Sequence, residues 1–310
     1  MTNAPRDILV VAHAHREDTV AAARRVIAAL VAAGARPVLP ADDDALVVAL
    51  SDLGRLAMLG ADVPVADVEI AIVLGGDGTI LRAAELVRDG TAPILGINMG
   101  HVGFLAEIEA DVIDDAMQRV IARDYEVEER MTLSARVKDA AGTVIYETWA
   151  LNEATVEKAS RERMMEVVME IDGRPLSTFG CDGVVISTPT GSTAYNFSAG
   201  GPVIWPTVEA LAVVPLSAHA LFARPLVVGP EAAVAIEVLA RTDGIGILWA
   251  DGRRSHDLPP GARVVVRRSD VPVRLARLHP APFTDRLVRK FQLPVTGWRG
   301  PERSDAREAE

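Results

Sequence analysis

Apolar and polar residues follow one another along the first 125 positions in a pattern that predicts strands separated by helices. We expect strands at residues 8–12, 36–39, 70–74 and 94–97. Helical patterns occur at residues 20–33, 80–87 and 112–123, and residues 45–57 also fit a helix with loops around it. Apolar strands that alternate with helices are typical of a parallel sheet covered on both faces. Residues 1–125 are therefore predicted to form an α/β domain.

The pattern changes near residue 125 to short alternating runs. We expect strands at residues 132–137, 144–149, 164–171, 175–179, 227–228, 233–239, 245–250, 263–266 and 273–277. Asp172-Gly173 separates two of these runs and is a strong signal for a two-residue hairpin. Residues 126–280 are thus predicted to form an all-β domain, a β-sandwich of two packed sheets. Residues 285–291 return to a helical pattern, and the charged residues 300–310 are predicted to be disordered.

Composition and charge narrow the class of protein. The chain has 310 residues, of which 49% are hydrophobic, and its net charge is −11. That charge argues against a nucleic-acid or anionic-membrane surface, where a basic stripe would be expected. Cys181 is the only cysteine, which excludes an intrachain disulfide. No apolar run has the length of a membrane span and no export signal is recognisable, so we expect a cytoplasmic enzyme.

Residues 75–79, Gly-Gly-Asp-Gly-Thr, lie between the predicted strand 70–74 and the predicted helix 80–87. Glycines let the backbone approach an anion, and the new helix offers unpaired N–H groups and the positive end of its dipole. A carboxylate in such a loop would repel phosphate, but it suits a group that meets the hydroxyl attacking a phosphate. Asp77 is therefore a candidate proton acceptor, although a turn with an Asp near the helix N-terminus would also explain the residue.

A second motif extends from Asp182 to Pro202. It begins Asp-Gly, continues through a predicted strand and opens into a hydroxyl-rich loop, Ser-Thr-Pro-Thr-Gly-Ser-Thr-Ala-Tyr. Between the two motifs lies the pair Asn152-Glu153. An irregular turn after a strand is the alternative reading of the loop, but its length and pattern favour a binding role.

Together, the three motifs resemble those of the NAD kinases, in the family's order and across nearly the whole chain. The resemblance implies transfer of the terminal phosphoryl group of ATP, or of polyphosphate, to the 2′-hydroxyl of the adenosine ribose of NAD. It implies that residues 281–299 pack back on the first domain, and that the chain assembles as a homodimer or homotetramer. Mg²⁺ or another divalent cation is expected to arrive on the donor phosphates, since no carboxylate cluster has ligand spacing. The site is expected between the two domains.

The resemblance also assigns site residues. Asp77 is the expected catalytic base, and the phosphate loop comprises Gly75, Gly76, Gly78 and Thr79. Arg82 is expected to pair with a phosphate, although a solvated surface Arg would fit as well. The NAD-binding residues implied are Asp77, Gly78, Arg82, Asn152, Glu153, Arg163, Asp182, Thr193, Ala194, Tyr195, Asn196, Phe197 and Ser198. Glu153 is expected to be ionised and to accept hydrogen bonds from the substrate nucleoside.

Two alternative functions remain open from the sequence. Lipid kinases and phosphofructokinases share a Gly-Gly-Asp-Gly loop, but the first should show an apolar or basic membrane patch and the second a further α/β domain. A nucleotide-binding regulator without turnover would gain nothing from Asp77. The sequence assigns no firm role to His13, His15 or Asp251, and His219 is expected to be structural.

Overall fold

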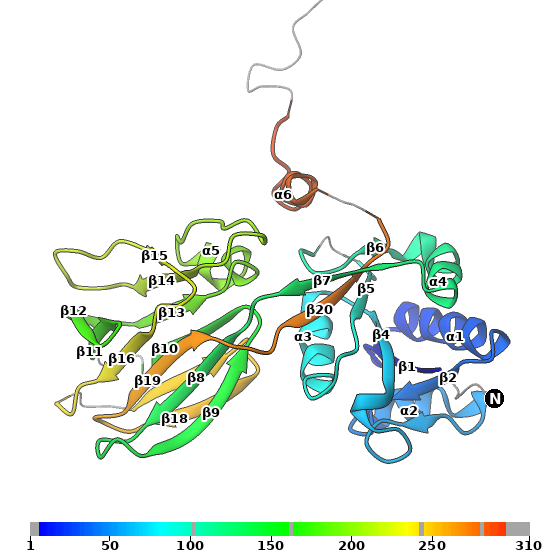
Figure 1. Ribbon diagram of the computed structural model, residues 1–310, viewed down its shortest axis with the longest axis horizontal. Coiled ribbons are helices and arrows are strands. Elements are labelled where there is room, and N and C mark those ends of the chain that lie inside the picture. The colour runs from blue at the N-terminus through cyan, green and yellow to red at the C-terminus, as the bar shows by residue number, and fades with distance from the viewer. Residues whose placement is uncertain (1–5, 101–102, 161–163, 242–244, 280–281, 296–310) are drawn as a thin grey trace, which may run out of the picture. The chain divides into compact units, whose positions relative to one another are not determined.

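The computed structural model describes residues 6–100, 103–160, 164–241, 245–279 and 282–295 (Figure 1). The chain divides into two compact units, and each is described by itself. Unit 1 comprises residues 1–127 and 276–310, and unit 2 comprises residues 128–275. The chain thus leaves unit 1 near residue 127 and returns to it near residue 276, a few residues away from the predicted boundaries at 125 and 280.

Unit 1 is built on a sheet of eight strands in the order β3-β2-β1-β4-β5-β20-β7, with β6 paired to β5. Strands β1 to β6 pair in parallel. Their bounds, with those of the last two strands, are β1 Asp7–Ala12, β2 Arg36–Leu39, β3 Ala57–Met58, β4 Val68–Leu74, β5 Ile94–Asn98, β6 Ile108–Glu109, β7 Glu126–Arg130 and β20 Val273–Arg277. The central strands β1 and β4 are buried almost throughout, which explains their continuous apolar runs.

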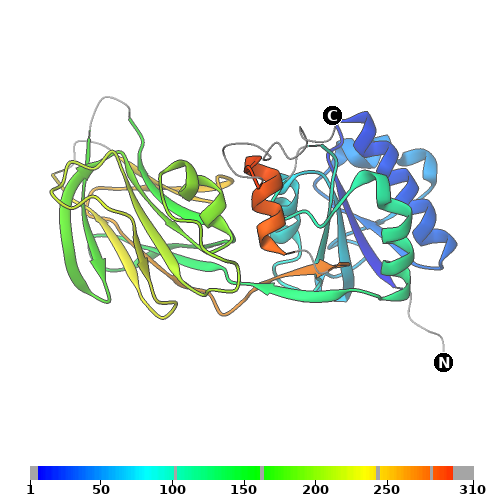
Figure 2. The same cartoon turned by 90° about the horizontal axis from the view of Figure 1, so that it is seen from above.

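Helices cover both faces of this sheet. Their bounds are α1 Glu17–Ala32, α2 Asp44–Ala49, α3 Asp77–Leu86, α4 Ile113–Ala122 and α6 Phe283–Phe291, with short 3₁₀ turns at Ser51–Leu53, Val65–Asp67 and Ala110–Val112. Helix α1 buries Ala22, Val26 and Leu30, spaced by four residues, and packs beside α4 on one face. Helix α3 lies on the opposite face (Figure 2). The predicted α/β architecture is confirmed.

The predicted helix at residues 45–57 is wrong in extent. Helix α2 ends at Ala49, the turn Ser51–Leu53 follows, and Ala57–Met58 forms the edge strand β3. Gly54 has φ +90°, which a helix does not tolerate and which glycine adopts without strain. The apolar pattern of residues 45–57 therefore did not reveal that the chain turns between α2 and β3.

Unit 2 contains two six-stranded antiparallel sheets. The orders are β15-β14-β13-β10-β17-β18 and β12-β11-β16-β19-β8-β9. The bounds are β8 Leu133–Lys138, β9 Val144–Ala150, β10 Glu153–Lys158, β11 Met165–Ile171, β12 Arg174–Cys181, β13 Gly183–Ser187, β14 Leu211–Leu216, β15 Leu226–Val228, β16 Val234–Val238, β17 Gly246–Ala250, β18 Arg254–Leu258 and β19 Arg263–Arg268. One apolar core includes residues of both sheets. The predicted all-β unit of two packed sheets is confirmed.

Two hairpins of unit 2 are closed by the same type of two-residue turn, Asp-Gly. Asp172-Gly173 joins β11 to β12, as predicted, and both residues have positive φ, +52° and +74°. Asp251-Gly252 joins β17 to β18 in the same way, with φ +53° and +63°. Such turns match the twist of the flanking strands and favour Asp-Gly. The sequence analysis did not anticipate β10, β14 or β18.

Candidate active site

The loop between β4 and α3 is closely packed. The backbone N–H of Gly75 donates to the Ile97 carbonyl (3.0 Å), and the carbonyl of Gly76 accepts from the N–H groups of Thr79 (3.0 Å) and Ile80 (3.2 Å). A Cβ at Gly75 would lie 2.4 Å from Thr79 Oγ1, so a larger residue would displace the threonine. Gly78 has open space around its Cα. The loop therefore presents the N-terminus of α3 with little side-chain bulk, as anion binding requires.

The carboxylate of Asp77 is held by the backbone of a separate segment. Phe104 N–H donates to Oδ2 and Leu105 N–H donates to Oδ1, each at 3.1 Å. A Cβ at Gly103 would lie 2.3 Å from Asp77 Oδ1. Asp77 is thus the first residue of α3, and its carboxylate binds a remote backbone segment instead of capping the helix, so its role as proton acceptor stays a prediction. Each carboxylate oxygen keeps a further acceptor site, so the group can still accept a proton from a hydroxyl.

Helix α6 and a buried carboxylate brace the segment that holds Asp77. The ring of Phe104 lies 6.1 Å from that of Phe283 and 5.7 Å from that of Phe291. Arg286 donates to the Phe104 carbonyl (2.9 Å) and to Glu107 Oε2 (3.0 Å). The side chain of Glu107, which is 1% exposed, also binds Arg277 (2.8 Å). Within unit 1 the chain therefore returns to support the candidate catalytic residue.

The guanidinium of Arg82 is already paired with carboxylates in the ligand-free protein. Its guanidinium binds Asp43 (2.7 Å) and Asp42 (2.9 Å). Asp43 is also the N-cap of α2, where it accepts from Leu46 N–H. A phosphate contact by Arg82 would have to compete with these two carboxylates, and its role toward substrate stays a prediction.

In unit 2, Asn152 and Glu153 lie where β10 begins. The carboxylate of Asp251 accepts three backbone N–H groups there, from Leu151 (2.9 Å, Oδ2), Asn152 (2.7 Å, Oδ1) and Glu153 (3.3 Å, Oδ1). A Cβ at Gly191 would lie only 1.9 Å from the Asn152 carbonyl oxygen. The Asn152-Glu153 turn is therefore enclosed between the Asp251 carboxylate and the hydroxyl-rich loop.

Glu153 is buried and carries a perturbed acid group. Its side chain accepts a hydrogen bond from the Tyr195 backbone, and burial, with the nearby charges of Asp251 and Glu157, raises its pKa to about 8. The expectation of an ionised Glu153 at pH 7 is therefore wrong for the ligand-free protein. Desolvation disfavours the charged form, and Asp251 adds repulsion of like charge.

Three buried polar atoms on one face of this sheet have no hydrogen-bond partner among the described residues. They are Glu153 Oε2, Thr155 Oγ1 and Ser187 Oγ. Glu153 is directly opposite Ser187 in the β10–β13 pair, and Thr155 follows on the same face. Buried polar atoms are almost always paired in proteins, so this row has capacity for a polar ligand group or water.

The loop after β13 is tied down by its own hydroxyls. Thr188 Oγ1 donates to the Leu151 carbonyl (2.6 Å), and Ser192 Oγ donates to the Pro189 carbonyl (2.6 Å). The short 3₁₀ turn Gly191–Thr193 and helix α5, Tyr195–Ser198, follow. The loop is therefore held in place before any substrate binds.

The residues predicted to bind NAD in this loop have different exposures. Tyr195, Phe197 and Ser198 are exposed, whereas Asn196 is fully buried. The Asn196 amide donates to the carbonyls of Ser192 (3.2 Å) and Pro202 (3.1 Å), so it closes the loop. Thr193 and Ala194 are half-buried. The exposed side chains are the ones available to a ligand.

Asp182 precedes β13 and is half-exposed. Lys158 Nζ lies 2.5 Å from its Oδ1, and this contact, with a hydrogen bond from Ser217, lowers the pKa of Asp182. His219 pairs with Gly180 through its backbone, in keeping with a structural role. Arg163, also predicted to bind NAD, lies outside the described residues.

The sequence analysis missed three supports of these groups: Asp251 as the acceptor of three amides, Gly103 beside Asp77, and Glu107 beneath it. The Asp251-Gly252 pair was a usable signal for a turn, but its partners are up to 100 residues away in the chain. His13 and His15 lie after β1 with their rings in a T-shaped contact at 5.8 Å. Nothing in the described part of the chain gathers three or more His, Cys, Asp or Glu side chains as metal ligands.

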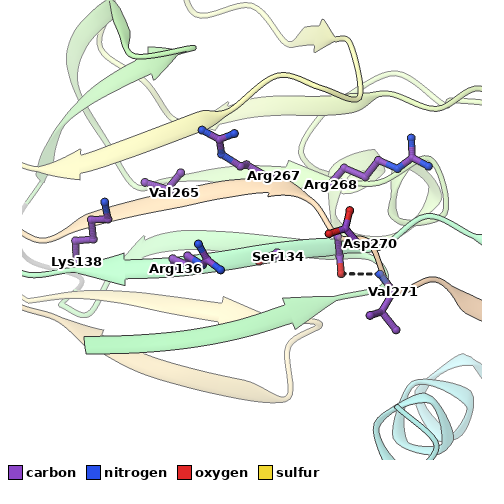
Figure 3. Close-up of a pocket in the computed structure, with 9 residues that line it drawn as sticks. Ser134, Arg136, Lys138, Val265, Arg267, Arg268, Asp270 and Val271 are labelled. Atoms are coloured by element: carbon purple, nitrogen blue, oxygen red, sulfur yellow. Dashed lines mark hydrogen bonds between the residues drawn. The ribbon is translucent and has the colours of Figure 1, made fainter. Parts of the chain in front are cut away.

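A separate hollow of about 460 Å³ lies over β8 and β19 (Figure 3). Its lining includes four basic side chains, those of Arg136, Lys138, Arg267 and Arg268. Arg136 pairs with Glu147 (2.9 Å) and Arg268 with Glu209 (2.7 Å), so part of this positive charge is compensated. None of the predicted site residues lines the hollow, and it is not part of the candidate site.

Comparisons with known proteins agree with this arrangement. Residues 60–125 match the family model of the ATP-NAD kinase N-terminal domain, and residues 151–278 match that of the ATP-NAD kinase C-terminal domain. A NAD kinase of Leifsonia xyli subsp. xyli is 66% identical over 97% of this chain and 99% of its own length. A NAD kinase of Thermobifida fusca is 56% identical over 95% of this chain and 92% of its own length.

Solved structures share the fold. A yeast NADH kinase complexed with NADH has a TM-score of 0.81 at 22% identity, covering 99% of this chain and 91% of its own. A NAD kinase from Archaeoglobus fulgidus in complex with ATP has a TM-score of 0.68 at 24% identity, covering 93% and 98%. None of the described helices is long and apolar enough to cross a membrane. By its domain matches and by relatives of such identity over nearly its full length, the chain belongs to the NAD kinase family.

Proposed function

We propose that the protein transfers the terminal phosphoryl group of ATP to the 2′-hydroxyl of the adenosine ribose of NAD, giving NADP and ADP. The observation that supports this reaction most directly is the Asp77 carboxylate, held at the N-terminus of α3 by two backbone N–H groups. That position combines a proton acceptor with unpaired helix N–H groups that stabilise phosphate oxygens.

The proposed step needs little covalent chemistry from the protein. The ribose 2′-oxygen forms a bond to the γ-phosphorus while the bond from that phosphorus to the bridging oxygen of ADP breaks. The hydroxyl proton passes to Asp77. Because the transition state of such transfers is loose, the proton leaves late and an ordinary carboxylate suffices. A divalent cation, Mg²⁺ in our proposal, would be carried on the donor phosphates and neutralise their charge.

Unit 2 supplies the groups that suit the nucleoside. Asn152 and Glu153 begin a strand, and Tyr195 and Phe197 offer exposed rings from the adjoining loop. Amide, carboxyl and aromatic groups suit ribose and adenine better than phosphate, whereas the Gly75–Thr79 loop of unit 1 suits phosphate. Polyphosphate as an alternative donor, a homodimeric or homotetrameric assembly and a cytoplasmic location stay predictions.

The test incubates purified protein with NAD, Mg²⁺ and either ATP or polyphosphate, and measures NADP with an NADP-specific dehydrogenase. We expect NADP with ATP, and the polyphosphate arm decides the donor range. NADH replaces NAD in a parallel arm. Absence of NADP in every arm would overturn the proposal.

The role of Asp77 is tested by Asp77→Asn. We expect kcat to fall by about 10²–10⁴-fold, the usual contribution of a positioned acid or base. Asp115→Asn, at an exposed position of α4, is the control and should leave kcat unchanged. Near-normal turnover by a folded Asp77→Asn protein would exclude this residue as the base.

A further inference from the structure

Asp251 is a buried carboxylate with an unusual set of partners. It lies in the tight turn between β17 and β18, is 7% exposed, and accepts N–H groups from Leu151, Asn152 and Glu153. Arg254 Nη2 lies 3.1 Å from its Oδ2. Its own N–H donates to the Glu153 carbonyl (2.9 Å). A carboxylate that accepts several N–H groups fixes the backbone that donates them, because each such bond is charge-assisted.

The backbone held by Asp251 is the link between β9 and β10. Strand β9 ends at Ala150 and β10 begins at Glu153, so the three amides span the turn between the strands. The Asn152 carbonyl on this turn accepts Thr188 N–H (2.9 Å), which ties the hydroxyl-rich loop to the same point. Displacing the turn would displace both groups of predicted nucleoside contacts in unit 2.

We propose that Asp251 is a positioning residue for NAD recognition, whose carboxylate holds the Leu151–Glu153 backbone so that the side chains of Asn152 and Glu153 are presented to the substrate. This inference rests on the proposed function. Asp251 itself is covered by the turn that it holds, and it acts through Asn152 and Glu153.

The chain contains a matched control. Asp172 occupies the equivalent place in the other Asp-Gly turn, with nearly the same φ. Its Oδ1 accepts Ala233 N–H (2.8 Å), and its own N–H donates to the Ala233 carbonyl (2.9 Å). This turn joins β11 to β12 and carries none of the predicted site residues. Replacing Asp172 removes a similar turn carboxylate without touching the Asn152-Glu153 link.

The charge of Asp251 offers a readout that a purely structural role would not move. Glu153 is faced by Asp251 and Glu157, which raise its pKa, and by the Tyr195 backbone N–H, which lowers it. Arg254 faces Asp251. Loss of the Asp251 charge should therefore lower the pKa of Glu153, and the pH dependence of stability due to Glu153 should move to lower pH.

The experiment compares Asp251→Asn with Asp172→Asn in the full-length protein. Asparagine keeps one acceptor oxygen but places an NH₂ group against the donors Leu151 N–H and Arg254, so the turn loses part of its hold. We expect KM for NAD to rise about five- to 150-fold in Asp251→Asn, the range for an unpaired buried group, with KM for ATP changed less than about twofold. Hydrogen exchange of residues 151–153 should accelerate. Asp172→Asn should change neither.

The outcomes separate this inference from the proposed function. If wild-type protein makes no NADP, the proposed function fails, while amide exchange and the pH dependence of stability still test whether Asp251 holds the turn. If Asp251→Asn does not fold, Arg254→Gln replaces it, with a smaller rise in KM for NAD expected. Unchanged KM for NAD and unchanged exchange, in folded Asp251→Asn or in its replacement, would overturn the inference.

Discussion

Glu153 and Asp251 are two buried carboxyl groups on neighbouring segments, joined by a hydrogen bond from the Glu153 N–H to Asp251 Oδ1, and they differ in the number of donors around them. Burial raises the pKa of both. Three backbone N–H groups and Arg254 oppose that effect at Asp251, whereas a single N–H from the Tyr195 backbone opposes it at Glu153. A pKa of about 8 places the proton on Glu153 at neutral pH, whereas Asp251 has the larger set of hydrogen-bond donors. Paired acids with divided roles are common at functional sites.

The proton on Glu153 predicts how stability depends on pH. Its pKa is about 8 in the folded protein and near the ordinary 4.5 when unfolded, so between these values the folded state binds more protons. Folding stability should fall as pH rises, by about 3 kcal/mol between pH 6 and pH 9. Urea unfolding at both pH values, with Glu153→Gln as the comparison, measures this. Equal pH dependence in the two proteins would contradict the assignment.

Glu153 also provides a test of substrate recognition. If Glu153 faces the nucleoside as predicted, Glu153→Ala should leave a donor on bound NAD unpaired, at a cost of roughly 1–3 kcal/mol. KM for NAD should rise while KM for ATP changes much less. Steady-state kinetics with each substrate varied in turn makes the comparison, and an equal rise in both KM values would mean that Glu153 does not face the nucleoside.

Among single residues, the sequence identified those that lie in a local motif. Asp77 was found because glycines surround it between a strand and a helix. Asp251 and Glu107 were not, because their partners are remote: Asp251 binds amides 98 to 100 residues away, and Glu107 binds Arg277 and Arg286. The proton on Glu153 was missed for the same reason, since burial is a property of the folded chain.

At the scale of elements, the loop after β13 depends on close contact between two backbones. Gly191 has no space for a side chain beside Asn152, and backbone cannot move aside as a flexible side chain can. Periodicity predicted most elements of both units. It missed β10, in which Glu153, Thr155 and Glu157 alternate with core residues, because its first residue, Glu153, was interpreted as part of a binding motif and no strand was assigned to the residues after it. It missed the edge strand β3 because a strand of two residues is too short to show an alternation of apolar and polar positions.

Gly191→Ala should therefore separate the loop from the Asn152 turn. We expect a loss of about 1–3 kcal/mol in unfolding free energy, the usual cost of overpacking, and a higher KM for NAD. Gly229→Ala is the control, since that glycine has open space and no positive φ. Denaturant unfolding and NAD titration measure both effects. Wild-type stability and affinity in Gly191→Ala would show that the loop can shift freely.

At the scale of the whole molecule, the end of the chain supports the first functional motif. Arg286 of α6 binds both Glu107 and the Phe104 carbonyl, and Phe104 N–H holds Asp77. Arg286→Ala should lower kcat by up to about 10²-fold through misplacement of the Asp77 carboxylate, with KM for NAD little changed. Thr284→Ala, at an exposed position of the same helix, should be silent. Equal kcat in the two variants would show that α6 does not support catalysis.

The discontinuous unit 1 also has a consequence for synthesis. Unit 2 is one uninterrupted stretch, whereas β20 enters the sheet of unit 1 between β5 and β7, and α6 follows it. A nascent chain therefore contains all of unit 2 before it contains the parts that complete the Asp77 support. A chain that ended near residue 275 would contain the predicted nucleoside-binding residues of unit 2 but would lack Arg277 and Arg286, which bind Glu107 and, through Arg286, the Phe104 carbonyl. The proposed phosphoryl transfer therefore depends on residues 277 and 286, which are translated after every predicted nucleoside-binding residue of unit 2.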